Sequence, residues 1–308
     1  MIRRIGASIG RALIAIVLTV TFVFIVLRVS GDPVEMLLSS DATPEMMARI
    51  RAEWGLDQPL YIQYFTYVQH ILQGDFGRSL SDGRPALTVI LEKAPATLEL
   101  MGVGLLIGLV LGVVMGLFAA THRGSAIDRI VMGTAVLVHA MPSFLLCILA
   151  ILLFAVRLRW LPSGGGSSPL HLILPSLVIG LAAAGVIARF VRSSALEVIG
   201  QQYIRAASIK PLPRWYFFGF HILPNAALPL LTLIGFLVGG MIGGAAVVES
   251  VFAWPGIGRF LVTVVAKRDL AVVQTIVILI SLTMVLANLG ADILYTMVDP
   301  RLRDRREG

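Results

Sequence analysis

The chain has 308 residues, of which 57% are hydrophobic and only 14% are charged, with a mean hydropathy of +0.88. Soluble domains carry about a quarter of charged residues, so this composition excludes an ordinary soluble protein and indicates an integral membrane protein. The net charge of +7 does not indicate nucleic-acid binding, because the basic residues do not gather on one face with interleaved aromatic side chains.

The first apolar run, Ala12 to Leu27, follows three basic residues, Arg3, Arg4 and Arg11. No small-residue cleavage pattern follows it, so we interpret the run as a retained helix rather than a signal peptide. From Ile9 to Arg28 the stretch is about twenty residues long, which is enough to cross the hydrocarbon core. Residues 1–28 are therefore predicted to form a short cytoplasmic tail and the first transmembrane helix.

Residues 29–94 form a long polar segment that is predicted to be external, on the periplasmic side of the membrane. Thr43-Pro44-Glu45 is typical of a helix start and Gly55 of a helix end. A second helix is predicted from Leu60 to Leu72. Its shared face is formed by Tyr61, Tyr64, Phe65 and Val68. This face suits packing on the bundle, which we favour, but contact with the membrane surface or with another protein stays open.

Five further apolar runs are long enough to cross a bilayer. They cover residues 95–120, 130–156, 171–190, 223–248 and 272–296. Short cytoplasmic loops carry an excess of Lys and Arg. Basic residues of this kind are Arg123 and Arg129 in one predicted inner loop, Arg189, Arg192, Arg205, Lys210 and Arg214 in or beside the next, and Arg301, Arg303, Arg305 and Arg306 in the tail 297–308. We therefore predict an all-α protein of the bacterial inner membrane, with six transmembrane helices and both termini in the cytoplasm.

Small residues and prolines mark particular places in these spans. Glycines recur at helical spacing in the second and fifth spans, at Gly104, Gly108, Gly112 and Gly116 and at Gly235, Gly239 and Gly243. Such ridges permit close approach of helices, and they predict tight contacts within the bundle. Pro142, Pro175, Pro224 and Pro229 mark hinges or packing adjustments. The single cysteine, Cys147, excludes an intrachain disulfide and is predicted to be a small packing residue.

Ionisable groups inside a membrane mark function by default, and only Glu99 and Asp292 are expected within the spans. Both lie within about two turns of a helix end, so a structural role is favoured over an ion or proton relay. The five histidines lack the spacing of metal ligands. None of the lysines follows a glycine, so the phosphate-binding loop of ATPases is absent and any ATP chemistry belongs to another chain.

The cytoplasmic loop 195–225 contains a polar stretch, Glu197 to Asn225, between two apolar runs. A helix here would place Ile199, Tyr203, Ala206 and Ala207 on one small apolar face. Pro211 and Pro213 would end it, because proline lacks a backbone donor and crowds the preceding turn. A helix of about ten residues is marginal alone, so it needs a surface to pack on. Spacing alone favours its own bundle as that surface.

Several motifs together resemble one family. Tyr203-Ile204-Arg205-Ala206-Ala207, with His221-Ile222-Leu223-Pro224-Asn225 beyond it, resembles the EAA loop of ABC importer permeases. Further motifs are similar in order and spacing to the first permease of dipeptide, oligopeptide and nickel uptake systems. They are Gly31-Asp-Pro-Val34, Gly55-Leu-Asp-Gln-Pro-Leu60, Gly74-Asp-Phe-Gly77, Pro95-Ala-Thr-Leu-Glu99, Trp254-Pro-Gly-Ile-Gly-Arg259 and Val298-Asp-Pro-Arg301.

The resemblance implies the six-helix permease fold, with residues 95–296 holding spans two to six. It implies that the EAA-like segment is a coupling helix that docks into a groove on an ATPase subunit. The residues implied for this contact are Tyr203, Ile204, Arg205, Ala206, Ala207, Ser208, Ile209, Lys210 and Pro211, with His221, Pro224 and Asn225 fixing the return into the fifth span. No substrate-binding or catalytic residue is assigned.

The implied function is the transmembrane subunit of an ATP-driven importer that works by alternating access. Its implied partners are a homologous permease, two ATPase subunits, an external solute-binding protein and membrane lipid. The chain itself would hold no cofactor, and ATP and Mg would bind the partner ATPases. A stand-alone ion-coupled carrier or channel is the alternative, and a scaffold without transport is a third possibility. Peptide, nickel chelate and glutathione-like solutes all stay open.

One departure from the family concerns the end of the coupling helix. The family usually has Ala-Lys-Gly there, whereas this chain has Ser208-Ile209-Lys210-Pro211. Glycine permits a left-handed exit from the helix and proline does not, so a different turn is expected after Lys210.

Overall fold

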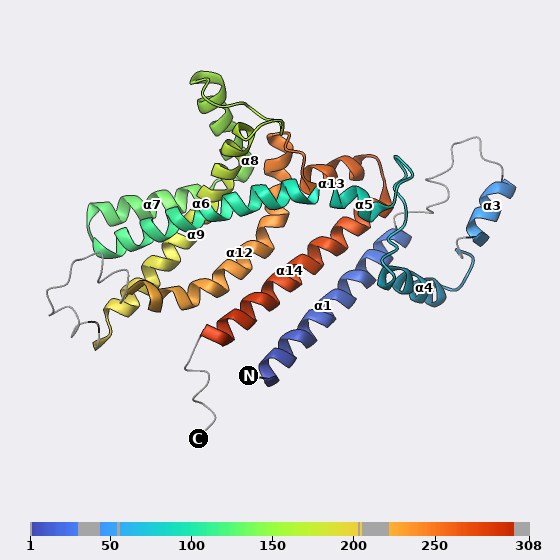
Figure 1. Cartoon of the computed structure of the whole chain (residues 1–308), viewed down its shortest axis with the longest axis horizontal. Helices are drawn as coiled ribbons and strands as arrows, with labels where there is room; N and C mark the ends of the chain where they lie inside the picture. Colours follow the sequence, from blue (N-terminus) through green and yellow to red (C-terminus); the bar gives the residue numbers. More distant parts are fainter. Residues whose placement is uncertain (1, 30–43, 54–55, 203, 205–221, 299–308) are drawn as a thin grey trace.

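The computed structural model describes residues 2–29, 44–53, 56–202, 204 and 222–298 (Figure 1). The described part of the chain is all-α and contains no strand, apart from one isolated bridge between Arg78 and Pro85. Four helices are long and apolar enough to cross a membrane, and six spans result if each of two bent helix pairs counts as one. The expected architecture of an all-α membrane protein is therefore confirmed.

The long helices are α1 (Ile2–Val29), α6 (Ala94–Thr121), α9 (Leu170–Ile199), α12 (Leu223–Val251) and α14 (Leu270–Val298). α6 packs on α9, α12 contacts both α9 and α14, and α1 packs on α14. The first residues of α1 and the last residues of α14 lie at the same end of the bundle (Figure 1). Apolar side chains of α1 are exposed, as expected for a lipid-facing helix: Leu13, Ile14, Val17, Leu18 and Phe22.

The glycine ridge of α6 makes a close helix contact. Gly104, Gly108, Gly112 and Gly116 are all buried. A Cβ added at Gly112 would meet Cβ of Ile187 at 2.6 Å, and one at Gly116 would meet the carbonyl oxygen of Ala188 at 2.6 Å. The ridge therefore serves contact with α9 of the same chain. In α12, a Cβ added at Gly239 would meet Cγ of Met284 in α14 at 3.0 Å, so this contact is looser.

The run predicted as one span at 130–156 is broken. α7 (Ala126–Ala140) ends before Pro142, and α8 (Ser143–Ala150) continues into the π-helix η1 (Ile151–Arg157). The two parts meet at 106°, so α8 projects from the bundle (Figure 1). Pro142 cannot continue α7 because it lacks a backbone donor and restricts Met141 to the extended conformation it adopts. Cys147 is fully buried in a cluster with Leu174 and Phe252, as predicted for a packing residue.

The span predicted at 171–190 is longer than expected, because α9 continues to Ile199. Ala195 is fully buried in this extension, so packing sustains the helix beyond the apolar run. Pro175 lies inside α9 and is buried. The polar stretch from Glu197 thus begins within a transmembrane helix rather than in a loop.

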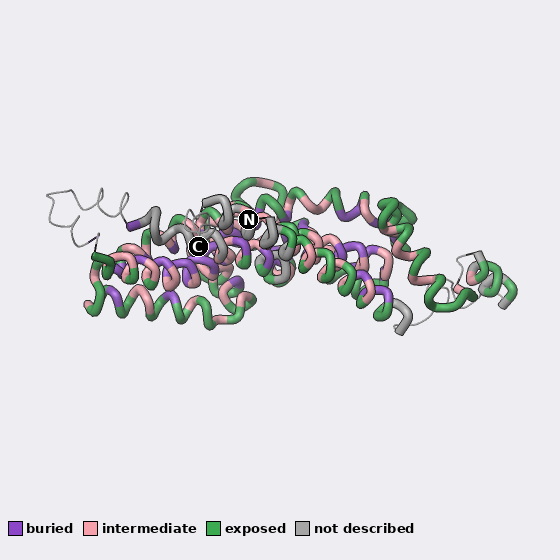
Figure 2. The backbone as a smooth tube through the Cα atoms, turned by 90° about the horizontal axis from the view of Figure 1, so that it is seen from below, coloured by how far each residue is buried: buried purple, intermediate pink, exposed green. Residues whose placement is uncertain are grey.

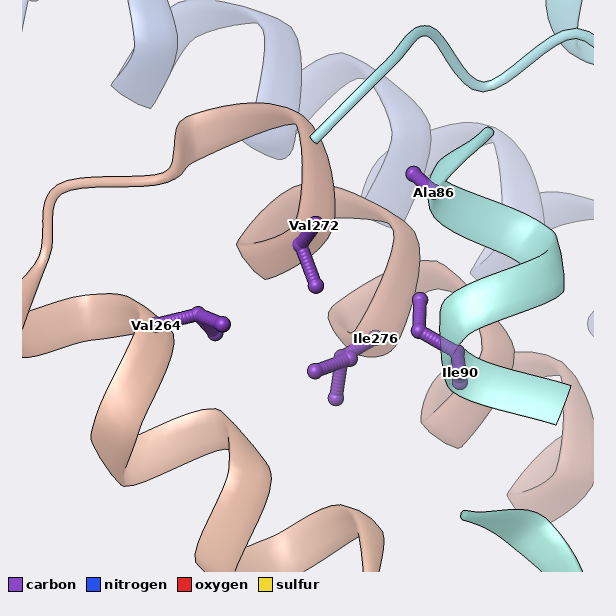
Figure 3. Packing of buried hydrophobic residues seen from close by; sticks show 5 residues of the cluster. All are labelled: Ala86, Ile90, Val264, Val272 and Ile276. Atoms are coloured by element: carbon purple, nitrogen blue, oxygen red, sulfur yellow. The ribbon is translucent and has the colours of Figure 1, made fainter. Parts of the chain in front are cut away.

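The segment between the first two spans is a helical insertion. It contains α3 (Pro44–Glu53), α4 (Leu60–Leu72) and α5 (Ala86–Leu91). The bounds of α4 agree with the prediction, whereas α5 and the short helix α13 (Ile257–Ala266) were not predicted. Figure 3 shows the small core that they share with α14, formed by Ala86, Ile90, Val264, Val272 and Ile276. This core closes one end of the bundle.

The molecule is long and flat in side view, with exposed residues along most helices (Figure 2). Buried and exposed positions alternate along the long helices α6 and α9, so each of these helices buries one face and leaves another uncovered. Such faces suit lipid or other membrane subunits, because hydrocarbon does not penalise exposed apolar side chains.

Candidate functional site

Most of the predicted coupling residues lie outside the described residues, namely Tyr203, Arg205 to Pro211 and His221. Ile204 is described, and its side chain is 1% exposed. Pro224 and Asn225 lie in the first turn of α12, where proline is well tolerated because the first helical N–H groups have no intrahelical partner. Of the predicted coupling residues, the structure therefore describes only Ile204, Pro224 and Asn225.

The described residues that flank residues 205–221 are anchored in the bundle. Ile204 precedes these residues and Ile222 follows them, and both are among the largest fully buried side chains. Ile222 packs in a cluster with Ala120 at the end of α6 and Ala195 near the end of α9. Ile222 therefore lies where α6 and α9 end and α12 begins.

A bidentate ion pair, which we call the brace, joins two helices at the same end of the bundle. Nε of Arg192 donates to Oδ1 of Asp128 at 2.6 Å, and the guanidinium also donates to Oδ2 at 2.7 Å. The Asp128 side chain is 5% exposed and that of Arg192 is 27% exposed. Paired N–H···O bonds between a guanidinium and a carboxylate fix geometry as well as charge. This pair holds the start of α7 against the last turns of α9.

The loop before α7 is shaped by the same carboxylate. Asp128 Oδ2 accepts a hydrogen bond from the backbone N–H of Gly124 at 2.9 Å. Ser125 caps α7, since its hydroxyl oxygen accepts from the backbone N–H of Asp128 at 3.2 Å. Arg129 donates to the carbonyl oxygen of Gly124 at 3.2 Å. The turn from α6 to α7 is thus rigid and tied to α9.

Sequence reasoning found only half of this brace. Arg192 was interpreted as a marker of the cytoplasmic side, and Asp128 was not singled out. Asp128 is an acid between Arg123 and Arg129 in a basic loop, which is a signal that it has a structural partner. Its partner lies 64 residues away in the chain, and a single sequence does not connect the two.

A second polar cluster lies at the opposite end of α12, around Glu249. This side chain is fully buried. Its carboxylate accepts from the hydroxyl of Thr97 at 2.7 Å and from the backbone N–H of Arg259 at 3.0 Å. Thr97 in turn accepts from the backbone N–H of Ile257 at 2.8 Å. The first N–H groups of a helix have no partner inside it, and here Glu249 and Thr97 satisfy two of those of α13.

This cluster corrects the sequence analysis. The fifth span was predicted to end at Val248, but α12 continues to Val251 and includes Glu249. The prediction that only Glu99 and Asp292 are ionisable groups within the spans is therefore wrong. Glu99 is exposed, and the side chain of Asp292 lies outside the described residues.

The motif from Trp254 to Arg259 gains a structural explanation from the same cluster. Nε1 of Trp254 donates to the carbonyl oxygen of Ala96 at 2.9 Å, which joins the motif to the start of α6. A Cβ at Gly258 would meet Cα of Ala246 at 2.5 Å, and one at Gly256 would overlap the Glu249 carboxylate. Only glycine fits at these two positions. The motif therefore joins α6, α12 and α13.

Comparison with known proteins identifies the family. Residues 112–304 match the family described as "Binding-protein-dependent transport system inner membrane component", and residues 1–101 match its N-terminal companion. The chain belongs to this family. It is an ABC importer permease of the peptide and nickel uptake type.

The permease is also similar to curated proteins along nearly its whole length. It is 39% identical over 303 residues to the glutathione transport system permease protein GsiC of Salmonella choleraesuis strain SC-B67. It is 38% identical over 303 residues to GsiC of Escherichia coli strain K12. Each alignment covers 98% of both chains.

A solved structure titled "Crystal structure of an amino acid ABC transporter with histidines" is 18% identical, with a TM-score of 0.48. The match covers 70% of this chain and 95% of that one.

Family membership settles the general role of the permease. It is a multi-pass inner-membrane subunit of an ABC importer, and ATP hydrolysis belongs to other subunits. Members of such a system work with another permease, ATPases and a binding protein. The alternative of a stand-alone ion-coupled carrier or channel is not favoured.

Proposed function

We propose that this permease imports a small peptide of the glutathione class. The support is its 38–39% identity to glutathione permeases over 98% of both chains. Dipeptides, longer peptides and nickel chelates are the competing solutes for this family of importers, and the test below includes them.

The coupling segment is proposed to be Tyr203 to Pro211, with the return at His221, Pro224 and Asn225. The observation that carries this proposal is the anchoring of Ile204, near the start of the segment, and of Ile222, which follows His221 in the return, at 1% and 0% exposure. A segment that must transmit force needs a stiff mounting, because a loose one would absorb the displacement. The Arg192–Asp128 brace stiffens the adjoining helix ends in the same way.

In the proposed assembly this chain pairs with one homologous permease, two ATPase subunits and an external binding protein. Both termini lie in the cytoplasm, and α4 lies on the opposite side of the membrane. ATP-driven closure of the ATPases would move the coupling segments, and the permeases would rock and release the solute inward. The small side chains of Ala206 and Ala207 would allow close seating in a groove on the ATPase.

The test uses the complete complex in proteoliposomes, with ATP inside and labelled glutathione outside. We expect ATP-dependent uptake that requires the binding protein, and weaker competition by dipeptides and by a nickel chelate than by unlabelled glutathione. Stronger competition by a dipeptide or by the chelate would reassign the solute. Uptake by this chain alone, driven by an ion gradient, would overturn the importer mechanism.

The coupling segment has its own test in Ala207→Glu, with Ala207→Ser as the matched control. The long charged side chain should fill the space that alanine leaves for the ATPase groove, so uptake should fall while the complex still assembles and hydrolyses ATP. Serine is nearly as small as alanine and should retain transport. Normal uptake by the glutamate variant would remove Ala207 from the contact.

A further inference from the structure

Helix α4 has three distinct faces along its length. One face is partly buried and consists of Tyr64, Tyr67, Val68 and Ile71. The next face is apolar and strongly exposed, with Tyr61 at 65%, Phe65 at 68% and Leu72 at 82% exposure. The remaining face is exposed and mostly polar, with Thr66, Gln69 and His70, and it also includes Ile62 at 38% exposure. At 100° per residue these sets occupy successive sectors of the helix.

The partly buried face packs on two transmembrane helices. The hydroxyl groups of Tyr64 and of Thr21 in α1 are 2.8 Å apart, and Tyr67 donates to Oε1 of Gln274 in α14 at 3.3 Å. The rings of Tyr64 and Tyr67 lie 5.3 and 5.6 Å from the ring of Phe24. Burial raises the pKa of the Tyr67 phenol, so it stays protonated as a donor.

These contacts set the depth of α4 in the membrane. Thr21 and Phe24 belong to the apolar stretch Ile9–Val26, and Gln274 belongs to the apolar stretch Leu270–Gly290. At 1.5 Å per residue, Thr21 lies about 7.5 Å along the axis before Val26, and Gln274 lies about 6 Å beyond Leu270. α4 is therefore attached to the apolar stretches themselves, about 6 to 7.5 Å inside their ends.

We propose that α4 is an interfacial helix whose exposed apolar face, formed by Tyr61, Phe65 and Leu72, lies in the acyl chains of the surrounding leaflet. In the orientation proposed above this is the outer leaflet. Amphipathic helices at an interface bury their apolar face by about 5–10 Å, which matches the depth of attachment. Tyrosine suits this level, since its ring is apolar and its hydroxyl is polar.

Two further observations favour lipid as the occupant of this face. Ile25 lies one helical turn from Thr21 on the same side of α1 and is 52% exposed, so the apolar face of α4 continues the lipid-facing surface of α1. α4 contains no Asp, Glu, Lys or Arg, so no charged side chain opposes immersion. A binding protein in the aqueous phase would have to reach below the ends of the spans to cover the same face.

The experiment measures the depth of a nitroxide label in the full complex, reconstituted in phosphatidylcholine and phosphatidylglycerol vesicles. The labels are attached at Phe65→Cys, on the apolar face, and at Thr66→Cys, on the polar face, in a Cys147→Ala background. Oxygen concentrates in hydrocarbon and a nickel chelate stays in water. We expect a higher ratio of oxygen to nickel collisions at position 65 than at position 66.

Two outcomes would overturn the proposal. Equal preference for the nickel chelate at both positions would place the face in water. A label at position 65 that is shielded from both reagents, and is released when the binding protein is omitted, would assign the face to that protein. If Phe65→Cys fails to assemble, Leu72→Cys replaces it, because Leu72 lies on the same apolar face. The readout is independent of transport, so failure of the proposed solute would leave this result interpretable.

Discussion

Arg192 and Asp128 lie 64 residues apart in the chain, yet the guanidinium of one holds both carboxylate oxygens of the other at 2.6 and 2.7 Å. The pair joins the end of α9 to the start of α7 beside the proposed coupling segment. A buried ion pair is weak evidence for stability, because desolvation of the charges offsets their attraction. Its geometry indicates that its main effect is to fix the register of the two helices.

Breaking this pair from one side should be costly. Asp128→Ala would leave Arg192 and the N–H of Gly124 without their acceptor. Because Arg192 is 27% exposed and can still reach water, we expect a cost of about 1–3 kcal/mol, that of a polar group left without its partner. Arg192→Lys should cost less, since it keeps the charge but loses the paired hydrogen bonds. Thermal unfolding of the complex in detergent measures both effects, and a double-mutant cycle isolates their coupling. Additive effects of the two substitutions would show that the pair does not act as a unit.

The buried carboxylate of Glu249 gives a graded prediction. Glu249→Ala removes the acceptor for both Thr97 and the N–H of Arg259, and each unsatisfied group costs about 1–3 kcal/mol. Glu249→Gln keeps one acceptor oxygen and nearly the same shape, so it should destabilise less than alanine. Melting temperatures of the purified complexes test this order. Equal loss in the two variants would indicate that shape rather than hydrogen bonding sets the role of the side chain.

The glycines of α6 allow a matched comparison within one helix. Gly116→Ala would place a Cβ against the backbone oxygen of Ala188, which cannot move aside cheaply. Gly102→Ala meets nothing within 4 Å and should be neutral, or stabilising by up to about 1 kcal/mol through helix propensity. The effects of both substitutions are measured by protein yield and by melting temperature after detergent extraction. A tolerated alanine at position 116 would contradict the close approach of α6 and α9.

The proposed orientation predicts from which side of the membrane a reagent reaches each of two loops. A cysteine at Ser208 should react with an impermeant maleimide only from the cytoplasmic side, and one at Ser81 only from the outside, because Lys and Arg accumulate in cytoplasmic loops. Intact cells and inside-out vesicles provide the two arms. Labelling of both positions from one side would reject the topology.

Much of the helical layout could be predicted because apolar runs in a membrane must form helices to satisfy their backbone groups. The bounds of α4 were also predicted correctly, and the structure places Pro59 directly before its first residue. The break at Pro142 was only half predicted, since proline is tolerated in some transmembrane helices and breaks others according to their neighbours. The glycine ridge indicated a close contact, but its partner α9 came only from the structure.

The polar sites were harder to predict because they depend on pairs far apart in the chain. Thr97 and Glu249 lie 152 residues apart, and the sequence around either residue does not predict a contact with the other. The helix α13 is short, and its start depends on acceptors supplied by α6 and α12 rather than on its own sequence. The coupling residues from Arg205 to Pro211 lie outside the described residues, so their assignment stays a prediction.

The tight seam between α6 and α9 has a consequence for any change of shape in the membrane. Backbone atoms of the two helices leave no space for even one added carbon at Gly116, so the pair behaves as a single stiff lever arm. α12 differs, since it bends by 49° between Gly240 and Gly244, where a Cβ would meet nothing within 4 Å. A force applied at the end of this helix pair beside the proposed coupling segment would therefore bend α12 long before it separated α6 from α9.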